Sequence, residues 1–148
     1  MEQLRAPSLT GLKVLDFTQA WAGPIATMML ADLGADVAKI EPPGIGDHVR
    51  KWTRPDLNGL SPYYLAANRN KRSLVIDLKR PEGVELALRL SEQADALVEN
   101  FRPGTMNRLG LGYDVVSKRN PRLVYCSVSG YGASGPYADR AAYDLLVQ

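Results

Sequence analysis

Apolar and polar positions follow two different periods along the chain, and segments of the two kinds alternate. Apolar runs of strand length occur at residues 12–17, 36–41, 73–77, 96–100 and 123–129. Between them, apolar residues recur every three or four positions, which is the spacing of one face of a helix. Strands that alternate with helices indicate βαβ units with right-handed crossovers. The pattern therefore predicts an α/β fold with a doubly wound, Rossmann-like parallel sheet.

The predicted helices carry start and stop signals. The first spans residues 24–33, with Pro24 at its first position and Gly34 just beyond its end. We expect its apolar stripe to pack on the sheet, and this stripe consists of Ile25, Met28, Met29 and Leu33. Further helices are expected at residues 61–67, 81–94, 105–109 and 113–118, and a last one near Ala141.

Size and composition indicate a single globular domain. The 148 residues are 45% hydrophobic, which suffices for a packed core. No helix-ending signal follows the last apolar residues, so we expect residues 1–148 to form the N-terminal part of a larger domain, truncated at its C-terminal end. No segment approaches the roughly 18 apolar residues of a membrane span, and the first residues contain no signal peptide. We expect no membrane association.

Charge and cysteine content exclude further classes. Eighteen basic and sixteen acidic residues leave a formal charge of +2, which is too balanced to indicate a nucleic-acid partner. Cys126 is the only cysteine, so an internal disulfide is excluded and a reducing compartment is favoured. We expect Cys126 to be a buried strand residue rather than a catalytic thiol. The cytoplasm is the expected location.

The turn at residues 18–23 is the strongest candidate for a binding site. It is small and mostly uncharged, and it lies between the first strand and the helix that begins at Pro24. In an open parallel sheet, ligands bind outside the carboxyl ends of strands, where such a turn presents N–H groups and the positive end of a helix dipole. The turn lacks G-x-G-x-x-G, so a dinucleotide is not the first expectation. Residues 76–79, 100–102 and 129–132 should converge on the same edge.

Basic residues flank the third and fourth strands near this edge. They are Lys71, Arg72, Lys79, Arg80, Arg102 and Arg108. Arginine suits bidentate contact with phosphate and lysine adds a mobile charge, so the set fits a ligand with several phosphates and an apolar or aromatic part. The competing interpretation is that these side chains only solvate loops. Convergence at one edge favours a binding role for Lys79, Arg102 and Arg108.

The other residues that could do chemistry give weaker evidence for a functional site. His48 is the only histidine, but it lies in an irregular, charged segment at residues 47–60 without a nucleophile at readable spacing. We expect a surface or interface histidine there. Asp144 is equally compatible with a helix N-terminal charge and with a role in the site. No His, Cys or carboxylate group has metal-ligand spacing, so no metal is expected.

Six ordered motifs together resemble the class III coenzyme A transferases, a group that includes formyl-CoA:oxalate CoA-transferase, carnitine CoA-transferase and the related α-methylacyl-CoA racemases. The motifs lie at residues 12–17, 22–24, 33–41, 70–73, 98–104 and 142–144, and the resemblance extends from Leu9 to Gln148. It implies a CoA-binding α/β domain within a larger subunit that pairs into an interlocked homodimer. Acyl-CoA and a carboxylic acid are the implied substrates, and CoA is the implied cofactor.

The resemblance also implies contacts with the CoA chain. Ala20, Trp21 and Ala22 would contact it, with Trp21 at the position that faces the thioester. Asn100 and Phe101 would line the path of the pantetheine arm.

At the other end of CoA, the resemblance implies that Ile76 and Lys79 flank the adenosine and phosphates and that Arg108 contacts phosphate. Tyr143 matches a tyrosine of the transferases close to the active centre. Tyr143 and its neighbour Asp144 are candidate supporting residues there.

Two positions separate the members of the group. Formyl-CoA transferases have an arginine where this chain has Pro42, which weakens a formyl or oxalate assignment. Racemases have a proton-transferring histidine where this chain has Tyr143, which favours transfer over epimerisation. An α-methylacyl-CoA racemase remains an alternative.

In the family, the nucleophile is an aspartate a short way beyond the Tyr-Asp helix, so it is expected after Gln148. Its carboxylate would attack the acyl-CoA thioester to give a mixed anhydride and then an enzyme thioester, which divides one difficult exchange into easier steps. No catalytic residue is expected within residues 1–148, and this portion alone is expected to lack turnover. A non-catalytic CoA-binding fragment is the third alternative.

Overall fold

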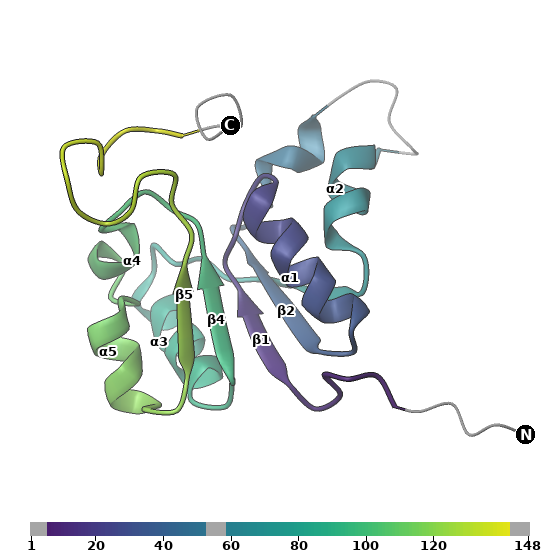
Figure 1. The fold of residues 1–148 in the computed structure, drawn as a ribbon, viewed down its shortest axis with the longest axis horizontal. Helices are drawn as coiled ribbons and strands as arrows, with labels where there is room; N and C mark the ends of the chain where they lie inside the picture. Colours follow the sequence, from purple (N-terminus) through teal and green to yellow (C-terminus); the bar gives the residue numbers. More distant parts are fainter. Residues whose placement is uncertain (1–5, 53–58, 143–148) are drawn as a thin grey trace, which may run out of the picture.

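The computed structural model describes residues 6–52 and 59–142 and contains one parallel sheet with helices on both faces (Figure 1). The strand order is β3-β2-β1-β4-β5. The strands are β1 (Lys13–Asp16), β2 (Asp36–Glu41), β3 (Lys71–Val75), β4 (Ala96–Glu99) and β5 (Val124–Ser127). All four strand pairings are parallel. The predicted doubly wound, Rossmann-like fold is confirmed.

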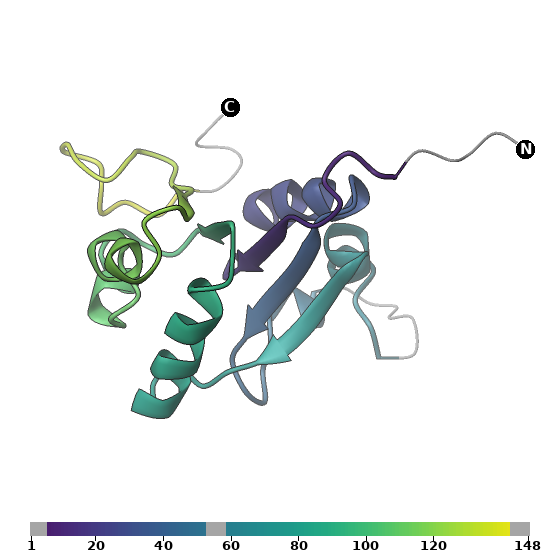
Figure 2. The same cartoon turned by 90° about the horizontal axis from the view of Figure 1, so that it is seen from below.

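The helices divide between the two faces of the sheet. They are α1 (Ala22–Asp32), η1 (His48–Lys51), α2 (Pro62–Asn68), α3 (Pro81–Ser91), α4 (Thr105–Arg108) and α5 (Tyr113–Arg119). One face carries α1, η1 and α2, and the other carries α3, α4 and α5 (Figure 2). The chain changes face between β3 and β4, because it must return past β2 and β1 to continue the sheet on the far side of β1.

Two apolar layers hold the sheet to its helices. The larger layer lies against α3, α4 and α5 and includes Leu15, Phe17 and Leu97. The smaller layer lies against α1 and includes Val14 and Val98. Neighbouring strand residues point to opposite faces, so Val14 and Leu15 enter different layers. Both faces of the central strands are therefore buried, as parallel sheets require.

Strand β3 begins two residues earlier than the predicted span of residues 73–77. Lys71 pairs with Val37, and the ladder ends at Val75 opposite Glu41. This strand is at the edge of the sheet, where polar residues are tolerated, so its position does not follow the most apolar run. Ile76 leaves the ladder and enters the larger layer.

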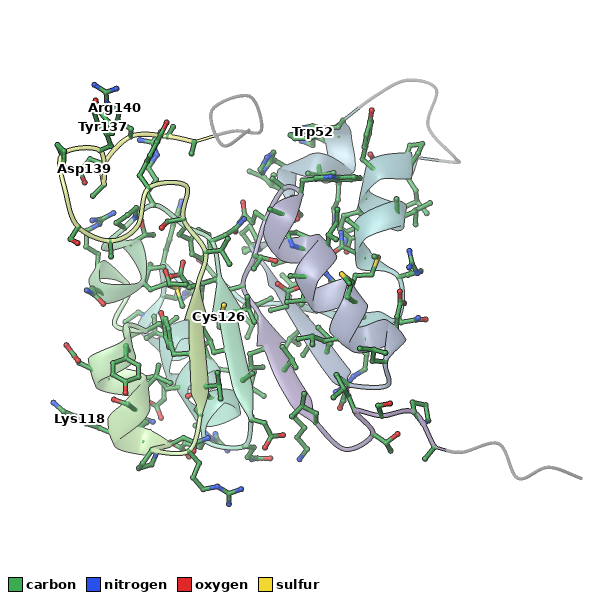
Figure 3. The ribbon with its side chains drawn as sticks, viewed as in Figure 1. Trp52, Lys118, Cys126, Tyr137, Asp139 and Arg140 are labelled. Carbon is green, nitrogen blue, oxygen red and sulfur yellow. The ribbon has the colours of Figure 1, made fainter. Side chains whose placement is uncertain are left out.

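Two further expectations were wrong in detail. Of the predicted apolar stripe of α1, Met28 is buried, but Met29 is 57% and Leu33 is 50% exposed. Small residues of the helix, Thr27 and Ala31, approach the sheet instead. Cys126 is exposed rather than buried, because β5 is the other edge strand (Figure 3).

The last described residues of the chain form no helix or strand. Ala141 and Ala142 are irregular, and the predicted last helix, with Tyr143 and Asp144, lies outside the described residues. Within residues 6–52 and 59–142, no helix combines the length and the apolar character needed to cross a bilayer.

Candidate functional site

The site is built around the crevice between the carboxyl ends of β1 and β4, where the chain order of the sheet reverses. After β1 the chain turns towards β2, and after β4 it turns towards β5. This divergence marks the switch point of the sheet, and in open α/β sheets ligands bind in the crevice outside the strand ends at such a point. Phe17 N–H donates to the Val98 carbonyl at 2.8 Å and extends the ladder one residue past β1.

Beyond that point a side chain replaces the ladder. The Gln19 N–H donates to Asn100 Oδ1 at 2.8 Å, and Asn100 Nδ2 donates to the Gln19 carbonyl at 2.8 Å. Asn100 therefore fixes the turn after β1 against the turn after β4. Phe101 follows, and its N–H donates to the Glu99 carboxylate at 2.9 Å.

The turn itself has an unusual backbone that its neighbours enforce. Ala20 adopts a left-handed conformation with φ of 66°, and its N–H donates to Asp47 Oδ1 at 3.2 Å. Gly23 packs directly on Thr18, since a Cβ at this glycine would lie 2.6 Å from the Thr18 Cβ and Cγ2 atoms. Helix α1 can therefore begin immediately after the turn, and no side chain caps its first N–H groups.

Aromatic side chains border the turn and form what we call the aromatic rim: Trp21, Tyr63, Trp52 and His48. The ring centroids are 5.5 Å apart for Trp21 and Tyr63, 6.3 Å for Trp52 and Tyr63, and 5.4 Å for His48 and Trp52. Trp52 lies at the end of the molecule to which the strands point (Figure 3). His48 is exposed at its edge, as expected from the sequence.

An open groove of about 420 Å³ lies between the start of α3 and helix α4. Its lining consists of Leu78, Lys79, Arg80, Pro81, Val84, Glu85, Arg108 and Leu109. Helix α3 begins just after β3 and α4 just after β4, so the groove lies at the same carboxyl edge as the crevice. Its one carboxylate, Glu85, is paired with Arg119 at 2.8 Å, which leaves the groove cationic over an apolar floor.

Two cations of this groove are available to an anion. In the part of the chain that the structure describes, no carboxylate lies within ion-pair distance of Lys79 or Arg108. Arg108 Nη2 donates to Thr105 Oγ1 at 2.9 Å, which orients the guanidinium without neutralising it.

Arg80 also lines the groove, whereas Lys71, Arg72 and Arg102 are not among its lining residues. The Lys71 side chain is buried, and its Nζ lies 2.9 Å from Asp16 Oδ2. Arg72 pairs with Asp36 at 2.6 Å near the amino end of β2. The expected availability of both cations to a ligand was wrong. Arg72 lies at the amino edge of the sheet beside Asp36, and the Lys71 ammonium is held inside the fold by Asp16 and the Pro24 carbonyl.

A buried polar network under α1 and α2 was missed by sequence reasoning. The Asp16 carboxylate accepts from the Thr18 N–H at 2.9 Å, from the Thr27 hydroxyl at 2.7 Å and from Lys71. Burial lowers the pKa of Lys71 to about 8, although Asp16 opposes this shift. Lys39 Nζ donates to the Thr18 carbonyl at 2.8 Å and lies 3.0 Å from Asp47 Oδ2.

Glu41 continues this network towards α2. Arg50 donates to both of its oxygens, at 2.8 and 2.6 Å, and Ser73 and Tyr64 also donate to it. Burial alone would raise the pKa of Glu41, but the hydrogen bonds from Arg50, Ser73 and the Asp47 N–H lower it to about 2. A signal existed in the sequence: Asp16, Lys39 and Glu41 occupy positions of one face in strands expected to be buried, where charges need partners.

The structure brings most of the predicted site residues together. Ala20, Trp21, Ala22, Asn100 and Phe101 meet at the ends of β1 and β4.

Lys79 and Arg108 share the groove. Ile76 is different, because its side chain is only 3% exposed within the core, which leaves its main chain as the part able to meet a ligand. Tyr143 lies outside the described residues. Among the residues described, no three His, Cys, Asp or Glu side chains are grouped to hold a metal ion.

The open parallel α/β sheet with a cationic groove at its carboxyl edge is the architecture of the doubly wound α/β class, in which ligands bind at the switch point of the sheet. The model of CoA-transferase family III matches residues 9–148. The chain belongs to this family.

The relatives agree with this assignment. The chain is 46% identical over 93% of its length to succinyl-CoA:glutarate CoA-transferase of Mus musculus. It is 48% identical over 97% of its length to succinate–glutarate CoA-transferase of Agrobacterium fabrum. It spans 32% and 38% of these two proteins. A CaiB/BaiF family protein from Brucella suis superposes with a TM-score of 0.90 at 44% identity, covering 96% of this chain and 38% of that one.

Proposed function

We propose that this chain is the CoA-binding portion of a class III CoA-transferase, which moves CoA between an acyl-CoA and a carboxylic acid. The observation that carries the proposal is that two features share the carboxyl edge of the sheet. One is the groove of Lys79 and Arg108, which have no carboxylate within ion-pair distance among the described residues; the other is the uncharged turn at Trp21, beside the Gln19–Asn100 bridge. CoA has the matching sequence of groups, with phosphates at one end and a neutral arm that ends in a thiol at the other.

The contacts follow from this order. Lys79, Arg80 and Arg108 bind phosphate oxygens, since guanidinium and ammonium groups suit them. Asn100 and Phe101 lie along the pantetheine arm. Residues 20–22 lie at the thioester end. The Ala20 N–H is bonded to Asp47, so the Trp21 and Ala22 N–H groups at the start of α1 meet the ligand, and Trp21 borders the acyl group.

The chemistry belongs to a residue after Gln148. An aspartate there attacks the thioester carbonyl, the C–S bond breaks, and CoA leaves as the thiolate while an acyl-aspartyl anhydride forms. The thiolate then attacks the aspartyl carbonyl, which releases the first acid and leaves an enzyme thioester for exchange with the second acid. Tyr143 and Asp144 precede this aspartate as supporting residues. We also propose an interlocked homodimer located in the cytoplasm.

The test uses the full-length protein that carries this chain. Incubated with succinyl-CoA and glutarate, the pair in the names of two relatives, it should form glutaryl-CoA and succinate. Acetyl-CoA with oxalate is the second pair. CoA binding without exchange across a panel of acids would instead indicate a binding module. Deuterium wash-in at the α-carbon of a 2-methylacyl-CoA would indicate the racemase. No measurable CoA binding would contradict all three.

A further inference from the structure

We propose that Lys39 and Asp47 are positioning residues that hold the turn after β1 in the conformation that binds CoA; this inference rests on the proposed function. The two side chains are buried and come from β2 and from the segment just before η1. Lys39 binds the Thr18 carbonyl at 2.8 Å, and Asp47 accepts from the Ala20 N–H at 3.2 Å. The pair therefore holds the turn by hydrogen bonds to the residue before Gln19 and to the residue after it.

Consecutive main-chain polar groups of the turn are all held by side chains. The Thr18 N–H donates to Asp16 and the Thr18 carbonyl accepts from Lys39. Both groups of Gln19 bond to Asn100, and the Ala20 N–H bonds to Asp47. A backbone fixed by side chains from two strands and two connecting segments keeps one geometry without a ligand. Such a turn avoids the entropy cost of ordering upon binding.

The conformation needs this restraint. A non-glycine residue in the left-handed region, such as Ala20, costs on the order of 1 kcal/mol and persists only where its surroundings over-determine it. Within the described residues, Asp47 Oδ2 has no hydrogen bond, and the Lys39 ammonium at 3.0 Å supplies its compensating charge. Loss of Lys39 therefore also disturbs Asp47, so the two act as one unit.

Asp47 also holds a second element, the short helix η1, by a hydrogen bond. Its Oδ1 accepts from the Val49 N–H at 3.1 Å and caps η1, which leads directly to Trp52 of the aromatic rim. One carboxylate oxygen thus fixes both the turn that carries Trp21 and the segment that carries Trp52. Asp47 therefore restrains both segments that carry these indoles.

The test compares two double variants of the full-length protein by calorimetric titration with free CoA. Lys39→Met/Asp47→Leu removes the hydrogen bonds of both side chains to the turn. Because both charges of the pair are removed together, neither is left buried without its partner. Lys39→Met/Asp47→Asn removes the charges but keeps an oxygen for the Ala20 and Val49 N–H groups. We expect about tenfold weaker CoA binding for the leucine variant, the equivalent of one buried hydrogen bond, and an intermediate value for the asparagine variant.

Tyr64→Phe is the matched control. It removes a hydrogen bond to Glu41 in the same network without touching the turn, so it should lower the melting temperature and leave CoA affinity unchanged. A second readout is the part of the tryptophan emission that a Trp21→Phe substitution removes. Its maximum should shift in the leucine variant and not in Tyr64→Phe.

Two results would overturn the inference. One is wild-type CoA affinity in the leucine variant; the other is an affinity loss in Tyr64→Phe as large as in the leucine variant. If the leucine variant does not fold, the asparagine variant decides, and wild-type affinity there overturns the inference too. Absence of CoA binding by the wild type would instead count against the proposed function.

Discussion

The side-chain amide of Asn100 and the main chain of Gln19 form a ring of two hydrogen bonds, each 2.8 Å long, between residues 81 positions apart in the sequence. The ring lies where the β1–β4 ladder ends, and it uses the donor and the acceptor of one amide. No other side chain of similar size offers both groups in this geometry. The ring therefore joins the turn after β1 to the turn after β4 at the edge where we propose that CoA lies.

We expect Asn100→Asp to lower the free energy of unfolding by about 1–3 kcal/mol, because a carboxylate oxygen would face the Gln19 carbonyl without a donor. The same change should weaken CoA binding, since the turn loses a support. Chemical denaturation and calorimetric titration measure the two effects.

Asn120→Asp is the control for that change. Asn120 Nδ2 donates to the carbonyls of Ser91 and Ala94 at 2.9 Å, at the amino edge of the sheet. It should cost comparable stability and leave CoA affinity unchanged. Equal affinity losses in the two variants would show that stability, and not the crevice, controls binding.

Lys79→Met and Arg108→Met should each weaken CoA binding by about tenfold at low salt, because each removes one charge-assisted contact with phosphate. Binding of pantetheine, which lacks the nucleotide, should not change. Arg72→Met, at the opposite edge of the sheet, should leave both affinities as they are. A parallel loss for CoA and pantetheine would contradict a phosphate role for the groove.

Gly23→Ala should destabilise the fold by about 1–3 kcal/mol, because the new methyl group would overlap the buried Thr18 side chain. Helix propensity alone predicts the reverse, a gain of about 1 kcal/mol. Ala26→Ser, at an exposed position of α1, should change stability by less than about 0.5 kcal/mol. Urea denaturation distinguishes these outcomes, and a stabilised Gly23→Ala variant would disprove the close contact.

Glu41 should make the fold sensitive to acid. Its pKa falls from the ordinary 4.5 to about 2 in the folded state, so its contribution is complete above pH 4.5 and is lost as the pH falls towards 2. The shift corresponds to on the order of 3 kcal/mol. Glu41→Gln should lower stability at pH 7 and flatten its dependence on pH between 4.5 and 2. Denaturation curves at fixed temperature across this range test it, and an unchanged slope would contradict the assignment.

Local patterns predicted the elements well where burial and end signals agreed. Strand β2 occupies the predicted residues 36–41, and α3 starts at Pro81 as expected. The prediction failed at the edge strands, where polar residues joined the ladder of β3 and Cys126 of β5 stayed exposed. Edge positions are decided by strand order, which a local period does not contain.

For the site residues too, the sequence predicted positions that follow from strand order and missed those that depend on contacts across the fold. The sequence predicted that Trp21 and Asn100 lie at one edge because each follows a strand end, and the structure places them there. Their roles in CoA binding, and that of Arg108, came from the family resemblance and stay predictions. Lys39 and Asp47 were missed because their importance lies in contacts across the fold, and Lys71 was misplaced because its long side chain reaches Asp16 beneath α1.

By itself the sequence determined the alternation of strands and helices, the parallel sheet and the edge that carries the crevice, since these follow from hydrophobic period and chain order. Only the tertiary structure decided which cations are free and which are neutralised. Pairing depends on three-dimensional distance: Lys71 and Lys39 lie beside buried carboxylates, whereas Lys79 and Arg108 face an open groove.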